Sequence, residues 1–295
     1  MTEKATIAFV GLGSMGLPMA QNLVQAGHSV CGFDMRTEAM DALVAAGGEK
    51  VESLQAACKS ASILILMVVN IDQARTVLID RGALAALPQG AHVCLMATCP
   101  PDAVKQLAQE VTAFGKELID APVSGGVVGA KAGTLTIMVG APRQSYDAVS
   151  SVLRIMGDKL YHCGPHQGQG AVVKAINQLL CGVHLAVAGE ALALGAKAGV
   201  DTATLLDIVT GSAASSWMLK DRGPRMLMEK PPVTSAVDIF VKDLGIALAA
   251  GRSVNMGLPL AAAAHQMFLS ESGSGNGLAD DSQVIAAYRR LNGIS

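Results

Sequence analysis

The chain has 295 residues, of which 51% are hydrophobic, 16% are charged and 3% are aromatic, and its formal net charge at pH 7 is −2. This length and hydrophobic content favour about two domains with substantial cores. Nucleic acid is not an expected partner, because the chain has no long basic run and few aromatic side chains to stack on bases. Six cysteines without a Cys-x-x-Cys pair, and an N-terminus without a secretory pattern, predict a cytoplasmic protein with reduced thiols.

The first segment combines an apolar strand, a glycine-rich turn and a helical stretch. Its Gly-x-Gly-x-x-Gly pattern lies at Gly11, Gly13 and Gly16. The first glycine permits a tight turn, the second allows a pyrophosphate to approach the backbone, and the third allows the helix to pack on the strand. A helix starting at about Ser14 would present free N–H groups to the phosphates. Cofactor contacts are predicted for Gly11, Leu12, Gly13, Ser14, Met15 and Gly16.

A second predicted strand ends at Asp34. A carboxylate at this place accepts hydrogen bonds from the adenosine ribose and repels a 2′-phosphate, so NAD is favoured over NADP. Met35, next to it, is predicted to contact the same cofactor. Arg36 leaves NADP open, because its guanidinium either pairs with a 2′-phosphate or is a solvated charge at a helix cap.

Beyond Asp34, apolar runs alternate with helical stretches, which predicts an α/β unit: a Rossmann-type, doubly wound parallel sheet covered on both faces. Strands are expected at residues 62–69, 92–97, 117–120, 134–140 and 159–163, and helices at 72–79, 101–114 and 142–156. Val69, Asn70 and Thr98 follow strand ends, where such sheets bind ligands, so they are expected to line the cofactor site. A nucleophilic role for Cys99 is not expected, since no histidine lies nearby in the sequence.

From about residue 167 the pattern is helical and rich in Ala, Leu and Met, which predicts a Rossmann domain at residues 1–165 and an all-α domain at 166–295. A long helix at 171–198 would join them, and a loop at 270–277 would precede a last helix at 281–291. The long helix is apolar, but residues such as Lys174 and Glu190 make a membrane span costly, so a buried helix of a soluble protein is expected. No metal site is predicted, because Gly164 and Pro165 separate the loose His162, Cys163 and His166 group and no carboxylate accompanies it.

Lys174 lies in the apolar first turns of the long helix, with Asn177 and Gln178 on the same face at i+3 and i+4. A buried lysine is costly unless it is paired or functional, and burial lowers its pKa from about 10.4 toward neutrality. Such an amine can take a hydroxyl proton during oxidation and return it in reduction, while Gln178 or Asn177 holds the substrate oxygen. The alternative is a lysine that extends to water from the helix N-terminus.

Residues 120–126 follow a predicted strand end and read Asp-Ala-Pro-Val-Ser-Gly-Gly. The Ser124 hydroxyl and the backbone N–H groups of Gly125 and Gly126 can bind a carboxylate. A plain turn is the alternative.

Four segments together resemble the β-hydroxyacid dehydrogenases, the group of 3-hydroxyisobutyrate dehydrogenase and tartronate semialdehyde reductase: residues 11–20, 120–126, 168–178 and 241–245. The resemblance covers nearly the whole chain. It implies an NAD(P)-dependent oxidoreductase that acts on a small hydroxy acid, with Lys174 as catalytic acid and base. It also implies that Ser124, Gly125 and Gly126 hold the substrate carboxylate and that Lys242 and Thr98 contact cofactor or substrate. A Rossmann sheet of six or more strands and a homodimer or homotetramer are further implications.

One position departs from the family pattern: many members carry Asn four residues after the lysine, whereas this chain has the longer Gln178. With residues 215–218, 235–245 and 280–285, this makes the chain similar to the L-threonate dehydrogenase branch, which oxidises a four-carbon sugar acid with NAD. Trp217 either walls the substrate pocket or lies in the core. Other hydroxy acids, imine reduction and a non-catalytic NAD-binding protein remain alternatives. Lys174 argues against the last two, because imine reductases generally have another residue there and a mere binder has no need of a desolvated ammonium.

Overall fold

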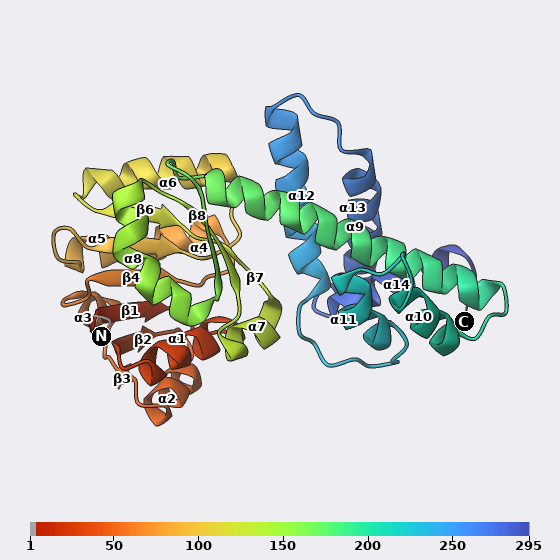
Figure 1. The fold of residues 1–295 in the computed structure, drawn as a ribbon, viewed down its shortest axis with the longest axis horizontal. Coiled ribbons are helices and arrows are strands. Elements are labelled where there is room, and N and C mark those ends of the chain that lie inside the picture. The colour runs from red at the N-terminus through yellow and green to blue at the C-terminus, as the bar shows by residue number, and fades with distance from the viewer. Residues whose placement is uncertain (1–3, 295) are drawn as a thin grey trace. The chain divides into compact units, whose positions relative to one another are not determined.

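The computed structural model describes residues 4–294, and the chain divides into two compact units, Met1–Lys174 and Ala175–Ser295 (Figure 1). The division lies later than the predicted boundary between residues 165 and 166. The reason is that the first turn of the long helix is hydrogen-bonded to a strand residue of the N-terminal unit, Asp120. The helix therefore begins in one unit and continues in the other.

The N-terminal unit contains a nine-stranded sheet with the order β3-β2-β1-β4-β5-β6-β8-β7, and β9 pairs with β8. The strands are β1 Thr6–Val10, β2 Ser29–Phe33, β3 Glu49–Lys50, β4 Ile63–Leu66, β5 His92–Leu95, β6 Glu117–Asp120, β7 Val123–Ser124, β8 Thr136–Gly140 and β9 Lys159–Gly164. The order reverses between β1 and β4, the switch point beside which open α/β sheets bind ligands. The Rossmann-type fold expected from the sequence is confirmed.

The prediction of a wholly parallel sheet is wrong at one edge. Strands β1 to β6 pair in parallel, but β8 runs antiparallel to both β6 and β7. Parallel neighbours need a crossover of about a dozen residues or more, and the segments that join β6, β7 and β8 are shorter than that. The chain therefore turns back within this part of the sheet.

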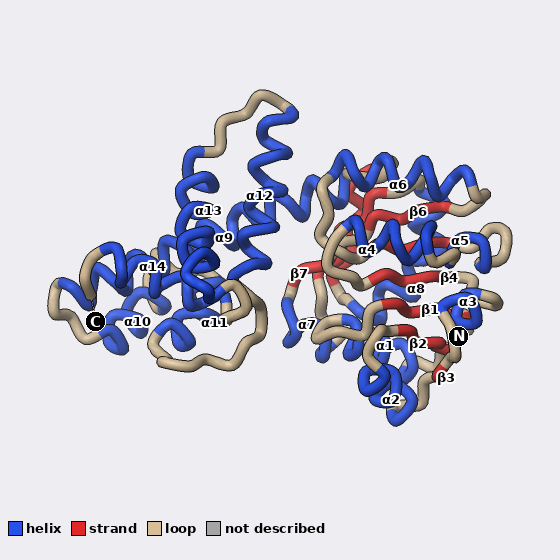
Figure 2. The backbone as a smooth tube through the Cα atoms, turned by 180° about the vertical axis from the view of Figure 1, so that it is seen from behind, coloured by secondary structure: helices blue, strands red, loops and turns tan. Residues whose placement is uncertain are grey.

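Helices cover both faces of the sheet: α1 Gly16–Gln25, α2 Thr37–Ala45, α3 Leu54–Cys58, α4 Ile71–Arg75, the π-helical turn η1 Thr76–Asp80, α5 Ala83–Ala86, α6 Pro101–Ala113, α7 Gly126–Ala132 and α8 Arg143–Met156. Alternate residues of β1 point to opposite faces. Ile7 and Phe9 share a core with residues of α1 and α8, whereas Ala8 and Val10 share one with residues of α3, η1 and α6. Figures 1 and 2 show these two sets of helices on opposite sides of the strands.

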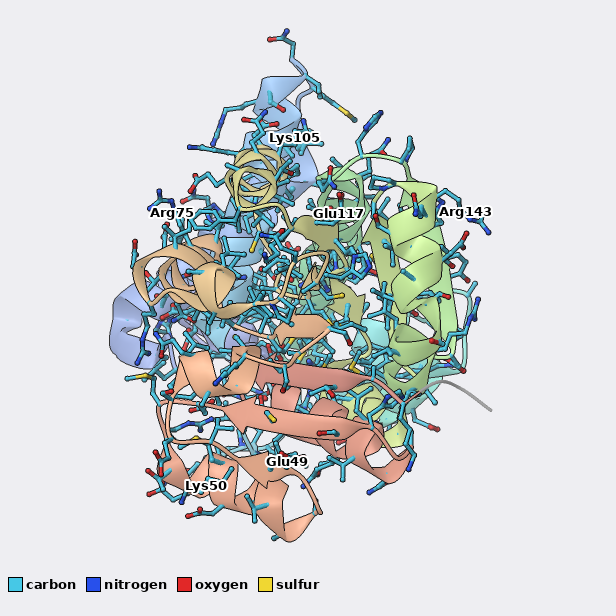
Figure 3. The ribbon with its side chains drawn as sticks, turned by 90° about the vertical axis from the view of Figure 1, so that its left-hand side faces the viewer. Glu49, Lys50, Arg75, Lys105, Glu117 and Arg143 are labelled. Carbon is cyan, nitrogen blue, oxygen red and sulfur yellow. The ribbon has the colours of Figure 1, made fainter. Side chains whose placement is uncertain are left out.

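Charged side chains gather around the margin of this unit, as the labelled Arg75, Lys105 and Arg143 show in Figure 3. Each of these three side chains forms an ion pair with a nearby carboxylate, at N–O distances of 2.9–3.1 Å. The pairs are largely exposed and contribute little to stability. The stability of the unit therefore comes mainly from its two apolar cores.

The C-terminal unit is helical, as predicted. The long helix α9 Gln169–Lys197 enters it, followed by α10 Thr202–Thr210, α11 Trp217–Met226, α12 Val237–Ser253, α13 Pro259–Glu271, the π-helical turn η2 Ser272–Asn276, the short η3 Asp281–Gln283 and α14 Val284–Leu291. Part of the segment expected as a loop at 270–277 is thus a helical turn. The core includes Leu185 and Leu192 of α9 and the rings of Phe240 and Phe268, which stack with centroids 5.0 Å apart.

Within the described residues, α9 is the one helix long and apolar enough to cross a membrane. One side of it packs into the core of the helical unit through residues such as Leu185, Ala188 and Leu192. It also carries the buried polar side chains of Lys174 and Gln178. These features are typical of a helix that packs into a protein core.

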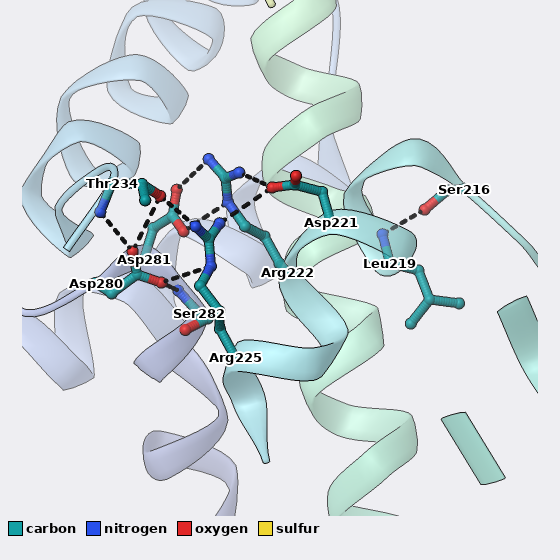
Figure 4. A network of polar contacts seen from close by, with 9 residues as sticks. All are labelled: Ser216, Leu219, Asp221, Arg222, Arg225, Thr234, Asp280, Asp281 and Ser282. Atoms are coloured by element: carbon teal, nitrogen blue, oxygen red, sulfur yellow. Dashed lines mark hydrogen bonds and ion pairs between the residues drawn. The ribbon is translucent and has the colours of Figure 1, made fainter. Parts of the chain in front are cut away.

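A polar network fastens α11 to the segment that precedes α14 (Figure 4). Arg222 Nε lies 2.9 Å from Asp281 Oδ1, and Arg222 also pairs with Asp221. Arg225 Nε lies 3.4 Å from Asp280 Oδ1. Both Asp280 and Asp281 are buried, and buried carboxylates are stable only when they are paired in this way.

Candidate active site

Two of the three glycines in the turn after β1 are required by the packing of the protein itself. Gly11 has a φ of +93°, and a Cβ on it would lie 2.4 Å from the carbonyl oxygen of Met67. A Cβ on Gly16 would lie 1.9 Å from the carbonyl oxygen of Gly11. For Gly13, by contrast, no described protein atom lies within 4 Å of the added Cβ. The open space beside Gly13 fits a ligand that approaches the backbone, such as a dinucleotide.

The helix after this turn begins at Gly16, later than the predicted start at Ser14. Leu12 and Ser14 therefore lie in the turn, and Met15 occupies the N-cap position without a side-chain capping hydrogen bond. These residues lie next to the end of β1, beside the switch point of the sheet.

Asp34 follows the end of β2 and is bonded to the same turn. Its Oδ2 accepts the backbone N–H of Leu12 at 2.7 Å, and its Oδ1 accepts the backbone N–H and Nε–H of Arg36 at 2.9 and 3.1 Å. Burial raises the pKa of Asp34, but the hydrogen bonds from Arg36 and Leu12 outweigh it and the pKa is lowered. The carboxylate is therefore negative at neutral pH, and Arg36 is its ion-pair partner.

A cavity of about 460 Å³ lies at the carboxyl ends of β2 and β3, next to Asp34 in the chain. Phe33, Ser53, Gln55 and Arg81 are among its lining residues. The Arg81 guanidinium lies 5.4 Å from the centroid of the Phe33 ring and donates to the exposed sulfur of Met35 at 2.9 Å. Sequence reasoning missed this cavity, because residues from three separate segments form it.

Val69, Asn70 and Thr98 follow β4 and β5, which are neighbours in the sheet. The Asn70 side chain accepts the backbone N–H of Gln73 at 2.9 Å and so caps α4. The backbone N–H of Val69 donates to the Gln73 side chain at 3.0 Å. Asn70 thus has a structural role that accounts for its residue type. Cys99, next to Thr98, is buried.

The Ser124 loop follows β6, the next strand of the parallel part of the sheet. Gly125 and Gly126 have φ angles of +133° and +61°, which other residues adopt with strain. A Cβ on Gly125 would lie 3.1 Å from the Leu135 side chain, so packing accounts for this glycine. At Gly126 no described protein atom lies within 4 Å of such a Cβ, which leaves room for a ligand beside its N–H group.

Lys174 is 5% exposed, although it lies close to the start of α9. The alternative of a lysine that extends to water therefore does not hold. It is the last residue of the N-terminal unit, the same unit that contains the glycine turn and the Ser124 loop.

Further along α9, the Gln178 side chain is buried and donates through Nε2 to Asp243 Oδ2 at 2.5 Å. Asn177 Nδ2 donates to Gln178 Oε1 at 3.0 Å. Lys242 Nζ lies 2.9 Å from the other oxygen of Asp243. Asp243 was missed by sequence reasoning, although it directly follows Lys242 in a motif that had been noted. Within the helical unit, Asp243 thus holds both Gln178 and Lys242.

The structure also shows the surroundings of two further residues considered in the sequence analysis, Trp217 and His162. Trp217 is 57% exposed at the start of α11, so the prediction that it could be a core residue is wrong. His162 Nε2 lies 2.8 Å from the Ala141 carbonyl oxygen, and its ring stacks on Tyr146. No group of three or more metal-ligating side chains occurs among the described residues.

A Rossmann-type unit that contains an open glycine turn and a buried lysine, followed by a helical unit, is typical of NAD(P)-dependent dehydrogenases. Residues 6–164 match the family model of the NAD binding domain of 6-phosphogluconate dehydrogenase, and residues 168–288 match that described as NAD-binding of NADP-dependent 3-hydroxyisobutyrate dehydrogenase. The chain belongs to the β-hydroxyacid dehydrogenase family, so the predicted family and enzyme class are confirmed. It is an oxidoreductase with an NAD(P) cofactor.

Relatives with similar sequences cover almost the whole chain. An L-threonate dehydrogenase of Cupriavidus necator is 42% identical over 283 residues, which are 96% of this chain and 95% of the relative. A 3-hydroxyisobutyrate dehydrogenase of Pseudomonas aeruginosa is 37% identical over 89% of this chain and 90% of the relative. The crystal structure of a 3-hydroxyisobutyrate dehydrogenase from Salmonella typhimurium is similar with a TM-score of 0.90 and 37% identity, over 95% of this chain and 98% of that one.

Proposed function

We propose that this chain oxidises a small hydroxy acid, L-threonate, with NAD as electron acceptor. The burial of Lys174 supports the type of reaction, because a buried amine is suited to exchange a proton with a hydroxyl group. The 42% identity to an L-threonate dehydrogenase supports the substrate. The second candidate is the acid of the 3-hydroxyisobutyrate dehydrogenases or tartronate semialdehyde reductases, supported by the 37% identical relative from Pseudomonas aeruginosa.

In the proposed reaction, each of the predicted site residues has a separate role. NAD(P), when bound, supplies the acceptor for the hydride that leaves the hydroxyl-bearing carbon. Lys174 takes the hydroxyl proton, while Asn177 and Gln178 bind substrate oxygens from the same helix. Ser124, with the N–H groups of Gly125 and Gly126, holds the carboxylate of the acid.

The cofactor would lie on the glycine turn and the strand ends beside it. The residues proposed to contact it are Gly11, Leu12, Gly13, Ser14, Met15, Gly16, Asp34, Met35, Val69, Asn70, Thr98 and Lys242. The negative Asp34 favours NAD, because a 2′-phosphate would be repelled. Arg36 is engaged by Asp34, which lessens its capacity to attract that phosphate.

A second copy of the chain is the proposed partner, as a homodimer or homotetramer in the cytoplasm. On α9, Ile176, Leu180, Val187 and Leu194 are each 50–69% exposed. Their spacing of 4, 7 and 7 residues places them on one side of the helix. An exposed apolar stripe of this kind is typical of a surface that another protein chain covers.

Turnover with a panel of acids tests the proposed activity. The purified chain is mixed with threonate, glycerate or 3-hydroxyisobutyrate and with NAD or NADP, and absorbance at 340 nm is followed; tartronate semialdehyde is tested with NADH. We expect the highest kcat/KM for threonate with NAD. Saturable NAD binding without turnover of any acid would instead support a non-catalytic NAD-binding protein.

A further inference from the structure

The carboxylate of Asp120 joins the end of strand β6 to the start of helix α9. Asp120 is 1% exposed, and its Oδ2 accepts the backbone N–H of Gly168 at 2.9 Å and that of Ala171 at 2.8 Å. Gly168 directly precedes α9 and Ala171 lies in its first turn, where backbone N–H groups have no partner within the helix. Lys174 follows Ala171 by three residues, so the bonds to Asp120 lie within about one helical turn of it along α9.

Close packing holds the same turn against the sheet. A Cβ on Gly170 would lie 2.4 Å from the carbonyl oxygen of Met138 in β8 and 3.1 Å from Asp120 Oδ2. A Cβ on Gly140, at the end of β8, would lie 2.7 Å from the backbone nitrogen of Gly170. The helix start therefore has no room to shift toward the sheet, and the bonds to Asp120 oppose a shift away from it.

Asp120 is also the first residue of the segment that leads to the Ser124 loop. Only residues 121–123 separate it from Ser124. One short segment thus contains both the anchor of the helix that carries Lys174 and the loop proposed to hold the substrate carboxylate.

The geometry points to Asp120 as a positioning residue, which sets the place of Lys174 relative to the Ser124–Gly126 loop. This inference rests on the proposed function. Its role is not to contact substrate or cofactor but to act through the start of α9, to which its carboxylate is hydrogen-bonded. Because misplacement of a reacting group by about 1 Å can cost 10²-fold in rate, a loose helix start would lower kcat.

The effect of the negative charge of Asp120 can be separated from the effect of its hydrogen bonds. Burial raises its pKa to about 7, against the effect of the N–H donors of Ala171, Gly168 and Gly170. Cys163 on β9 is a neighbouring ionisable group, because the charge of Asp120 contributes to its raised pKa. Glu117 lies on the same strand as Asp120 and accepts a hydrogen bond from Gln167 at 2.7 Å. The hydrogen bonds from Gly168 and Ala171 end on the same oxygen, so the amide oxygen of Asn can keep them without the charge, whereas Ala removes them.

Asp120→Ala and Asp120→Asn test the inference through kcat, KM, the NAD dissociation constant and amide hydrogen exchange of residues 168–174. We expect Asp120→Ala to lower kcat at least tenfold and to speed exchange at these residues, with NAD binding changed less than twofold. Asp120→Asn should restore kcat to within about threefold of wild type.

Asp201→Ala is the matched control. The Asp201 carboxylate accepts the backbone N–H of Thr204 at 2.7 Å and caps α10, a helix to which no catalytic or binding role is assigned. This variant should lose thermal stability without a change in kcat. If Asp120→Ala does not fold, Gly170→Ala tests the inference in its place. The added methyl group displaces the helix start and should lower kcat in the same way.

A folded Asp120→Ala or Gly170→Ala variant with wild-type kcat would overturn the inference, provided that Lys174→Ala is inactive. Wild-type turnover of Lys174→Ala would instead remove the proposed function, and this inference with it. The two failures are therefore distinguishable.

Discussion

At the scale of single residues, the informative positions are polar groups buried in apolar surroundings. Lys174 and Gln178 are buried on a helix that is otherwise rich in Ala, Leu and Val. Burial of such groups is unfavourable unless they are hydrogen-bonded or used. Gln178 has its partner in Asp243, and we assign the proton transfer of the proposed reaction to Lys174.

Lys174→Ala should lower kcat by about 10² or more, because proton transfer by a positioned side chain is lost. NAD binding should change little, since the glycine turn is untouched. Steady-state kinetics and NAD titration measure both quantities. Lys174→Arg is the control: it keeps the positive charge but cannot release a proton at neutral pH, so it should be as inactive as the alanine variant.

Asp34→Ser should lower the ratio of kcat/KM with NAD to that with NADP by about tenfold or more. The reason is that the repulsion of a 2′-phosphate is removed and Arg36 is released from its ion pair. Arg36→Ala should change the ratio in the opposite direction. Equal ratios in wild type and Asp34→Ser would show that Asp34 does not select the cofactor.

At the scale of elements, the long buried strands and amphipathic helices match their predicted positions to within a few residues, whereas short elements do not. The sequence pattern did not predict α2, β3, α3, α5 or α7, which have two to nine residues each. Segments of this length show too few turns or alternations to reveal a period. Where an element begins is decided by tertiary packing. The start of α9, for example, is hydrogen-bonded to Asp120 of β6.

The anchor of α9 should make stability depend on pH. The pKa of Asp120 is raised from 3.8 to about 7, so between these values the folded chain holds a proton that the unfolded chain has lost. This contribution therefore falls as pH rises from about 4 to 7, by at most about 1.4 kcal/mol per pH unit.

Urea unfolding of wild type and Asp120→Asn at pH 5 and pH 8 isolates this contribution, because Asn does not titrate. Relative to wild type, the Asn variant should be more stable at pH 8 than at pH 5. A difference that does not change with pH would contradict the raised pKa.

At the scale of the whole molecule, each unit has its own apolar core, and different elements cover the core in each. The N-terminal unit buries both faces of a sheet, and the helical unit surrounds part of α9 and is fastened by the ion pairs of Arg222 and Arg225. What the helical unit leaves uncovered is the apolar stripe of Ile176, Leu180, Val187 and Leu194.

Leu180→Glu should lower the solution mass measured by light scattering from two or four chains to one, because a charge placed in an apolar interface is costly. Circular dichroism should stay unchanged. Ile208→Glu is the control, since Ile208 is also exposed but lies on α10, away from the stripe. A single-chain mass for wild type would refute the proposed oligomer.

The sequence by itself determined the two kinds of unit, the glycine turn and the family, and it singled out Lys174 as the residue proposed to transfer the proton. Each of these depends on a local pattern: alternating apolar runs, spaced glycines or a lysine in an apolar helix. Only the tertiary structure decided that β7 and β8 run antiparallel, that Arg36 pairs with Asp34 and that Trp217 is exposed. It alone joined Asp120 to Ala171 and Gln178 to Asp243, residues 51 and 65 positions apart. Hydrogen bonds over such separations depend on how the chain packs, and no local periodicity encodes them.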